Sequence, residues 1–139
     1  MIAAPALTLI LVTACALVHY EVLRMLNDFL PETRVVSSRA KVLVALSGGL
    51  VSHLCQIALF AIAYYLLRDK FGLGVFGGQF QDTFSSFLYF SAETYTTLGF
   101  GDIFPVGQLR LMCGIEALTG LLMISWTASF TYLEMRRYW

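Results

Sequence analysis

Three long apolar runs, separated by short polar segments, constrain this chain more than any other feature. The runs cover about residues 2–26, 42–67 and 106–136. A helix needs about 20 apolar residues to cross the hydrocarbon core of a bilayer. Because lipid offers the backbone no hydrogen-bond partners, a segment that crosses it on its own must be helical. The sequence therefore predicts an all-α integral membrane fold with three transmembrane helices per chain.

The composition agrees with this fold class. Of the 139 residues, 58% are hydrophobic and 13% are charged, whereas a soluble domain averages about 45–50% and about 25%. The nine Lys and Arg residues balance the nine Asp and Glu residues, so no excess of positive charge marks the chain as a nucleic-acid binder. We find no catalytic triad, metal-ligand set or phosphate-binding loop, and we expect neither an enzyme nor a small-molecule substrate.

The chain divides into three parts on this reading. An N-terminal transmembrane helix covers residues 1–27, a linker expected to be cytoplasmic covers residues 28–41, and the other two apolar runs with the segment between them cover residues 42–139, which the resemblance described below implies to be one pore domain. Pro31 is expected to end the first helix, because proline lacks the N–H that a helix interior needs.

A re-entrant segment is predicted between the second and third apolar runs. A glycine-rich loop over residues 68–82 precedes a short helix over about residues 84–95, with Asp82 or Thr83 as its N-cap. This helix is too short to span a bilayer. Pro105 is expected to mark the start of the last helix.

The string Thr-Thr-Leu-Gly-Phe-Gly-Asp follows at residues 96–102. A cation filter replaces the water shell of an ion with rings of backbone carbonyls, which requires an extended strand with unusual dihedral angles. Gly99 and Gly101 can adopt such angles without steric cost. The string resembles the selectivity filter of potassium channels, T-x-G-[YF]-G-D, and predicts an extended filter strand here.

The resemblance is to single-pore-loop potassium channels of the bacterial two-helix type, and it covers residues 42–139. It implies a homotetramer in a lipid bilayer, with no cofactor other than bound potassium ions. It also implies that potassium binds the carbonyls of Thr97, Leu98, Gly99 and Phe100, with the Thr97 hydroxyl as the innermost ring and Gly101 completing the filter. A non-selective monovalent cation channel and an accessory channel subunit remain the alternatives.

Five residues around the string are expected to support the filter. The resemblance places Tyr89 and Phe90 as bracing aromatic residues and Thr96 beside the filter. It also implies a contact between Glu93 and Asp102 that shares one proton, because two touching carboxylates do not both stay ionised. In the other interpretation, Glu93 points to the water of the outer vestibule.

The cavity below the filter is expected to be lined by one stripe of the last helix. Counting from the filter as in the resembling channels gives Leu118, Leu122, Ser125 and Ser129. Gly114 and Gly120 are candidates for a hinge or for close helix packing, and packing is favoured.

Two ionisable residues lie within the apolar runs, where such groups are costly and indicate function. Similar expected depths predict that Glu116 pairs with His53, with Gln56 as a further partner. The cluster is either a structural staple or a proton-sensitive gate element, since histidine titrates near neutral pH. His19, by contrast, is interpreted as part of a solvated helix end.

The distribution of basic residues sets the expected orientation. The first connector and its edge carry Arg24, Arg34, Arg39 and Lys41, and the C-terminus carries Arg136 and Arg137, whereas the loop after the second run carries Arg68 and Lys70. We therefore expect a multi-pass protein of the plasma (inner) membrane, with the N-terminus outside and the C-terminus cytoplasmic.

Overall fold

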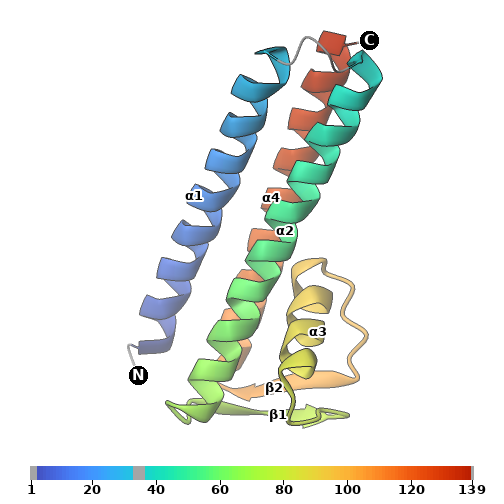
Figure 1. Ribbon diagram of the computed structural model, residues 1–139. Helices are drawn as coiled ribbons and strands as arrows, with labels where there is room; N and C mark the ends of the chain where they lie inside the picture. Colours follow the sequence, from blue (N-terminus) through green and yellow to red (C-terminus); the bar gives the residue numbers. More distant parts are fainter. Residues whose placement is uncertain (1–2, 33–36, 139) are drawn as a thin grey trace.

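The computed structural model describes residues 3–32 and 37–138, which form four helices and one two-stranded ribbon (Figure 1). In chain order the elements are α1 (Ala3–Glu32), α2 (Ser38–Asp69), β1 (Gly74–Gly78), α3 (Phe84–Tyr95), β2 (Ile103–Gly107) and α4 (Leu109–Tyr138). We call the end of the bundle that carries β1 and β2 the ribbon end, and the opposite end the connector end.

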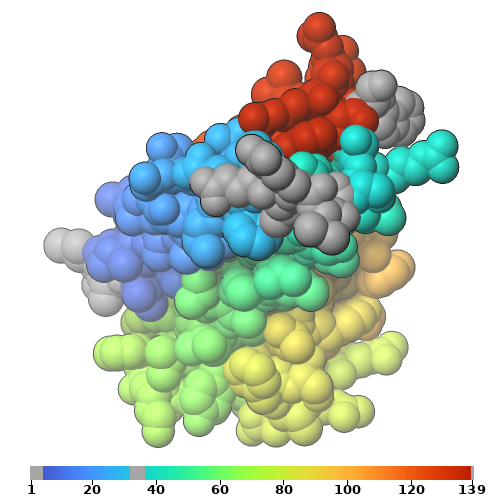
Figure 2. Space-filling view, turned by 45° about the horizontal axis from the view of Figure 1, so that its top comes forward, coloured from blue at the N-terminus to red at the C-terminus, as the bar shows by residue number. Residues whose placement is uncertain are grey.

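The three predicted transmembrane helices are present as α1, α2 and α4. Each is long and apolar enough to cross a membrane, and only 28–33% of the most apolar window of each is buried within the chain. Figure 2 shows α1 lying directly against α2 across one face of the molecule, with α3 beside α2. Most of the apolar helix surface is thus left for contact with lipid or with other chains.

The connector between the first two helices is shorter than predicted. Helix α1 continues through Pro31 and ends at Glu32, and α2 begins at Ser38 rather than near Val42. Ser37 caps α2 by accepting a hydrogen bond from the Ala40 N–H. Pro31 lacks the N–H that would continue the helix, and α1 ends one residue after it. Arg34 lies outside the described residues.

The prediction of a loop over residues 68–82 was wrong in part, because this segment contains a strand. Strand β1 pairs antiparallel with β2, and the register runs from Gly74 opposite Gly107 to Gly78 opposite Ile103. Pro105 lies within β2, and the last helix begins only at Leu109.

The ribbon holds the residue that ends the filter string. The Gln79 N–H donates to the Asp102 carbonyl at 2.8 Å. A Cβ atom at Gly78 would lie 2.0 Å from that same carbonyl oxygen, and Gly78 has φ +81°. Glycine is therefore required where β1 meets Asp102.

The short helix predicted before the string is confirmed as α3, with Thr83 as its N-cap residue. An aromatic cluster fixes α3 against α2 and the ribbon, because Phe90 makes edge-on contacts with both Tyr64 and Phe76. Phe87 and Phe80 extend the cluster. Offset and edge-on aromatic pairs of this kind stabilise a core beyond their area burial, so the cluster holds α3 against α2 and the ribbon.

Candidate functional site

The string at residues 96–102 runs beside α3. Figure 1 shows α3 beginning at the ribbon end and finishing partway along the bundle, from where the string returns to β2. Positive φ angles occur at Thr97 (59°), Gly99 (55°) and Gly101 (77°). Every second residue therefore has left-handed backbone, which is uncommon for a β-branched residue such as Thr97. The segment contains turns and bends and belongs to neither a helix nor a strand of the ribbon.

Four successive N–H groups of the string turn back toward the end of α3. Thr97 donates to the Thr94 carbonyl at 3.0 Å, Leu98 and Gly99 donate to the Glu93 carbonyl at 2.9 and 3.2 Å, and Phe100 donates to Glu93 Oε2 at 3.2 Å. No peptide bond in the described part of the chain is cis. In a planar trans peptide the C=O points away from the N–H, so the carbonyls of residues 96–99 point away from α3, on the exposed side of the string.

Glu93 and Asp102 each accept hydrogen bonds from other groups, and the proton expected to be shared between them stays a prediction. Glu93 is buried and uses Oε2 to accept from the Phe100 N–H. Asp102 instead accepts from the Tyr89 hydroxyl at 3.1 Å and from the Ile103 N–H.

The other predicted supports lie in different surroundings. Tyr89 contacts the string through Asp102, and Thr96 bonds back to the Ala92 carbonyl at 2.7 Å. Phe90, by contrast, is buried in the aromatic cluster between α2 and the ribbon. Phe90 therefore positions α3 against α2 and the ribbon, and its predicted role in bracing the string stays a prediction.

The residues predicted to line a cavity form one exposed stripe of α4. Leu118 and Leu122 are more than half exposed, and Ser125 and Ser129 are exposed as well. Both serine hydroxyls donate to backbone carbonyls one turn earlier, those of Leu121 and Ser125. The stripe is therefore free to face water or another chain, and its hydroxyls remain satisfied in either case.

The predicted pair of Glu116 and His53 was wrong. Glu116 lies seven residues after the start of α4 at Leu109, whereas His53 lies sixteen residues before the end of α2 at Asp69. Both of these helix ends are at the ribbon end, so the two side chains differ in depth by about 14 Å at about 1.5 Å per residue. They accordingly belong to two separate polar clusters.

Glu116 joins α4 to α2 and α3. The Tyr64 hydroxyl bonds Glu116 Oε2 at 2.5 Å, and Ser91 Oγ lies 2.5 Å from Glu116 Oε1 and 2.8 Å from the Ile57 carbonyl. A serine hydroxyl has one hydrogen, and a backbone carbonyl can only accept. Each of these contacts can be a hydrogen bond at the same time when Ser91 donates to the Ile57 carbonyl and a protonated Glu116 donates to Ser91. Sequence reasoning missed Tyr64 and Ser91, although both are polar residues on predicted helices.

His53 and Gln56 belong to the second cluster, which reaches the end of α3. His53 lies 2.9 Å from both the Tyr95 hydroxyl and the Thr127 hydroxyl, and Gln56 accepts from Tyr95 at 2.8 Å. His19 is also a member, with no exposed surface. Its interpretation as a solvated helix end was wrong because α1 continues thirteen residues beyond it, to Glu32.

Helix α4 approaches the end of α3 very closely at Gly120. A Cβ atom there would lie 1.9 Å from the Tyr95 carbonyl oxygen, whereas a Cβ atom at Gly114 would meet nothing within 4 Å. The favoured packing role is therefore confirmed for Gly120, whereas the described residues offer no packing partner to Gly114. Close backbone approach at glycine is typical of helix contacts in membranes.

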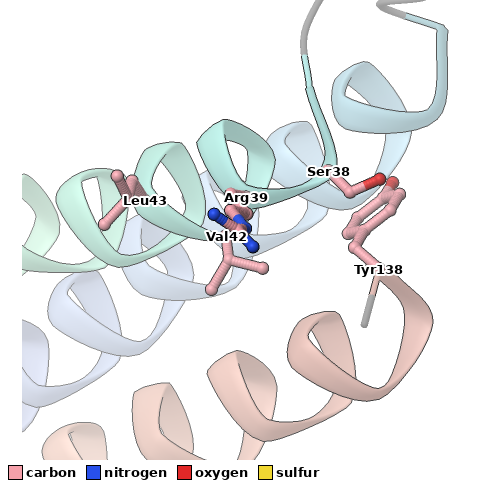
Figure 3. A pocket seen from close by; sticks show the side chains of 5 residues that line it. All are labelled: Ser38, Arg39, Val42, Leu43 and Tyr138. Carbon is pink, nitrogen blue, oxygen red and sulfur yellow. The ribbon is translucent and has the colours of Figure 1, made fainter.

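A hollow of about 750 Å³ lies at the connector end, between the start of α2 and the end of α4 (Figure 3). Its lining residues are Ser38, Arg39, Val42, Leu43 and Tyr138. The charged side chain among them is a cation, so the hollow does not suit a positively charged ion. It lies at the end of the bundle opposite the ribbon, and we assign it no part in the candidate site.

Comparison with known proteins agrees with the geometry. A sequence profile described as ion channel matches residues 52–135. The chain is also 35% identical, over 97 residues, to the inward rectifier potassium channel Kirbac3.1 of Paramagnetospirillum magnetotacticum. That match covers 69% of this chain and 30% of the relative, so the chain spans under a third of the length of that channel. No solved structure gives a significant match. The profile covers well over half of the described residues, and the chain belongs to the ion channel family.

Proposed function

We propose that the chain is one subunit of a homotetrameric channel that conducts potassium selectively. The ion ligands are the backbone carbonyls of Thr97, Leu98, Gly99 and Phe100, with the Thr97 hydroxyl as a further ring. One chain offers a single row of oxygens, whereas a dehydrated ion must be surrounded by rings of them. Four copies around a common axis complete each ring.

The observation that carries this proposal is the direction of the backbone in the string. Four N–H groups are held by the end of α3, and the carbonyls of residues 96–99, which include three of the four proposed ion ligands, consequently point to the exposed side. Backbone carbonyls without protein partners at membrane depth are tolerated where they line a wet pathway. The alternating left-handed residues supply the unusual backbone that this arrangement requires.

Helix α3 adds a favourable field to the same site. A helix C-terminus carries about half a negative charge, and α3 ends directly before the string. A cation waiting on the connector side of the filter is stabilised there. The exposed stripe that contains Ser125 and Ser129 lines the cavity in which the ion waits.

The orientation in the membrane follows from the basic residues of the described helices. Arg39 and Lys41 begin α2, and Arg136 and Arg137 end α4, all at the connector end. Cytoplasmic segments of membrane proteins carry an excess of Lys and Arg. The connector end therefore faces the cytoplasm of the plasma (inner) membrane, and the ribbon end faces outward.

Ion flux from liposomes that contain the purified protein tests this proposal. The wild type should release potassium much faster than sodium and should run as a tetramer on a sizing column. Gly99→Ala should lose the selective flux, because Gly99 has φ +55° and an L-residue is strained there by about 1–2 kcal/mol. Gly114→Ala, at a site where a Cβ atom meets nothing within 4 Å, is the matched control. A wild type that stays monomeric and passes neither ion would contradict the proposal.

A further inference from the structure

We propose that His19 of α1 is a positioning residue for the filter. Helix α1 lies outside the segment that matches the ion channel family, and nothing above gives it a function. The inference rests on the proposed function, since it concerns how well the filter selects potassium. It is carried by a closed ring of hydrogen bonds that links α1 to the last residue of α3.

The ring contains five side chains from the four helices. In order, Thr127 Oγ1 lies 2.9 Å from His53 Nε2, and His53 Nδ1 lies 2.9 Å from Tyr95 Oη. Tyr95 Oη donates to Gln56 Oε1 at 2.8 Å, and Gln56 Nε2 lies 3.1 Å from His19 Nδ1. His19 Nε2, at 3.2 Å from Thr127 Oγ1, closes the ring.

The Tyr95 bond sets one arrangement of hydrogens around the ring, and Ser52 Oγ lies beside it, 3.1 Å from both His19 Nδ1 and Gln56 Nε2. Because Tyr95 donates to Gln56, its oxygen is left to accept from His53 Nδ1. His53 Nε2 must then accept from Thr127, whose oxygen in turn accepts from His19 Nε2. His19 Nδ1 finally accepts from the Gln56 amide. Each of the five side chains donates once and accepts once within the ring, with both histidines neutral.

The ring controls the end of α3 because Tyr95 is the last residue of that helix and precedes Thr97 by two positions. Its side chain is held by the ring, and its carbonyl packs against Gly120 of α4. His19, Gln56 and Tyr95 have no exposed surface. Water therefore does not replace a partner that is lost. Without His19, the Gln56 amide keeps Ser52 Oγ as a partner at 3.1 Å but loses one of its two hydrogen bonds.

Helix α1 is thus connected to the filter by a specific path. Leu11 and Cys15 of the same helix make apolar contacts in the main core cluster, and Asn27 accepts a hydrogen bond from Arg137 at the connector end. Apolar contacts hold the helix in place but do not specify one orientation of a neighbouring polar group. Hydrogen bonds specify such an orientation. Gln56 Nε2 is held by His19 of α1 and by Ser52 of its own helix, both at 3.1 Å, and the other end of the amide then faces Tyr95.

The test is a double-mutant cycle read as the potassium-to-sodium permeability ratio in planar bilayers. His19→Ala should lower the ratio by roughly tenfold, the change expected when one buried hydrogen-bonding group loses its partner. Tyr95→Phe should lower it as well. The double variant should be no worse than Tyr95→Phe alone, because the path from His19 already ends at the missing hydroxyl.

Thr13→Val is the matched control on the same helix, since Thr13 is exposed and donates to the Leu9 carbonyl of α1; its ratio should equal that of the wild type. If His19→Ala does not assemble, Gln56→Leu takes its place in the cycle and should give the same loss.

Three results would overturn the inference. An unchanged ratio in His19→Ala, or in Gln56→Leu where that variant is used, would show that α1 does not position a selective filter. Additive effects in the cycle would show that His19 acts by packing and not through Tyr95. A wild type without potassium preference would overturn the proposed function, and this inference with it.

Discussion

Adding one methyl group at Gly120 should separate α4 from the end of α3. The new Cβ atom of Gly120→Ala would lie 1.9 Å from the Tyr95 carbonyl oxygen and 2.8 Å from its carbonyl carbon. These are backbone atoms, so no side-chain rotation relieves the clash. A Cβ atom needs about 3 Å, and α4 must therefore move by about 1 Å, at a cost of roughly 1–3 kcal/mol per subunit for overpacking.

The assay compares Gly120→Ala with Gly114→Ala on the same helix. A Cβ atom at Gly114 meets nothing within 4 Å, and alanine is a better helix former than glycine by about 1 kcal/mol. Thermal unfolding of the detergent-solubilised channel should therefore give a lower midpoint for Gly120→Ala and an unchanged or higher midpoint for Gly114→Ala. The potassium-to-sodium permeability ratio should fall only in Gly120→Ala, because the displaced Tyr95 precedes the filter. Equal midpoints and equal ratios in the two variants would refute the reasoning.

Three further predictions follow from single contacts. Glu116→Gln should leave the unfolding midpoint nearly unchanged, since an amide can donate and accept in place of a carboxylic acid. Glu116→Leu, by contrast, should lower the free energy of unfolding by about 1–3 kcal/mol for each hydroxyl left unpaired. A Gln variant as unstable as the Leu variant would contradict the assignment of a proton to Glu116. Gly78→Ala should loosen the ribbon beside Asp102, which faster hydrogen exchange of the β2 amides would reveal and protection equal to wild type would disprove. Arg68 donates to Asp82 at 2.6 Å and holds the pKa of that carboxyl below its usual range. The ion pair therefore stabilises the folded protein above the usual Asp pKa of about 4, and this contribution is lost as the pH falls below it. The difference in unfolding midpoint between wild type and Asp82→Asn should accordingly shrink at acid pH. A difference independent of pH would exclude the ion pair as its source.

The elements set by local sequence were predictable. Apolar length alone identifies the three long helices, because lipid leaves no other way to satisfy the backbone of a single crossing segment. The bounds of α3 follow from Thr83 at its start and the filter string at its end. The glycine pattern of residues 96–102 similarly anticipates the left-handed backbone at Gly99 and Gly101.

The ribbon was not predictable by the same means. Its strands are only five residues long and lie on either side of α3 and the string. Their pairing depends on how those elements fold back together, which no local pattern encodes. The glycines of β1 look like loop residues in the sequence, yet Gly74 and Gly78 are needed because backbone atoms of the β2 side come within contact distance.

The polar partners were mispredicted because depth in a bundle depends on where each helix ends. Errors of a few residues at the ends of α2 and α4 placed His53 and Glu116 at one level, although the structure separates them. Because the end of α1 was predicted too early, His19 was likewise assigned to a solvated helix end, although it is buried. A helical pattern shows which residues share a stripe, but it does not show which neighbouring helix that stripe meets.

The central claim is that residues 97–100 of four chains form a filter that selects potassium, and the reversal potential of the reconstituted channel tests it most directly. The purified protein is placed in a planar bilayer with potassium on one side and sodium on the other. The account predicts a reversal potential near the potassium equilibrium potential. Measurable current that reverses near zero would mean that the pore does not discriminate between the two ions, and it would contradict the claim.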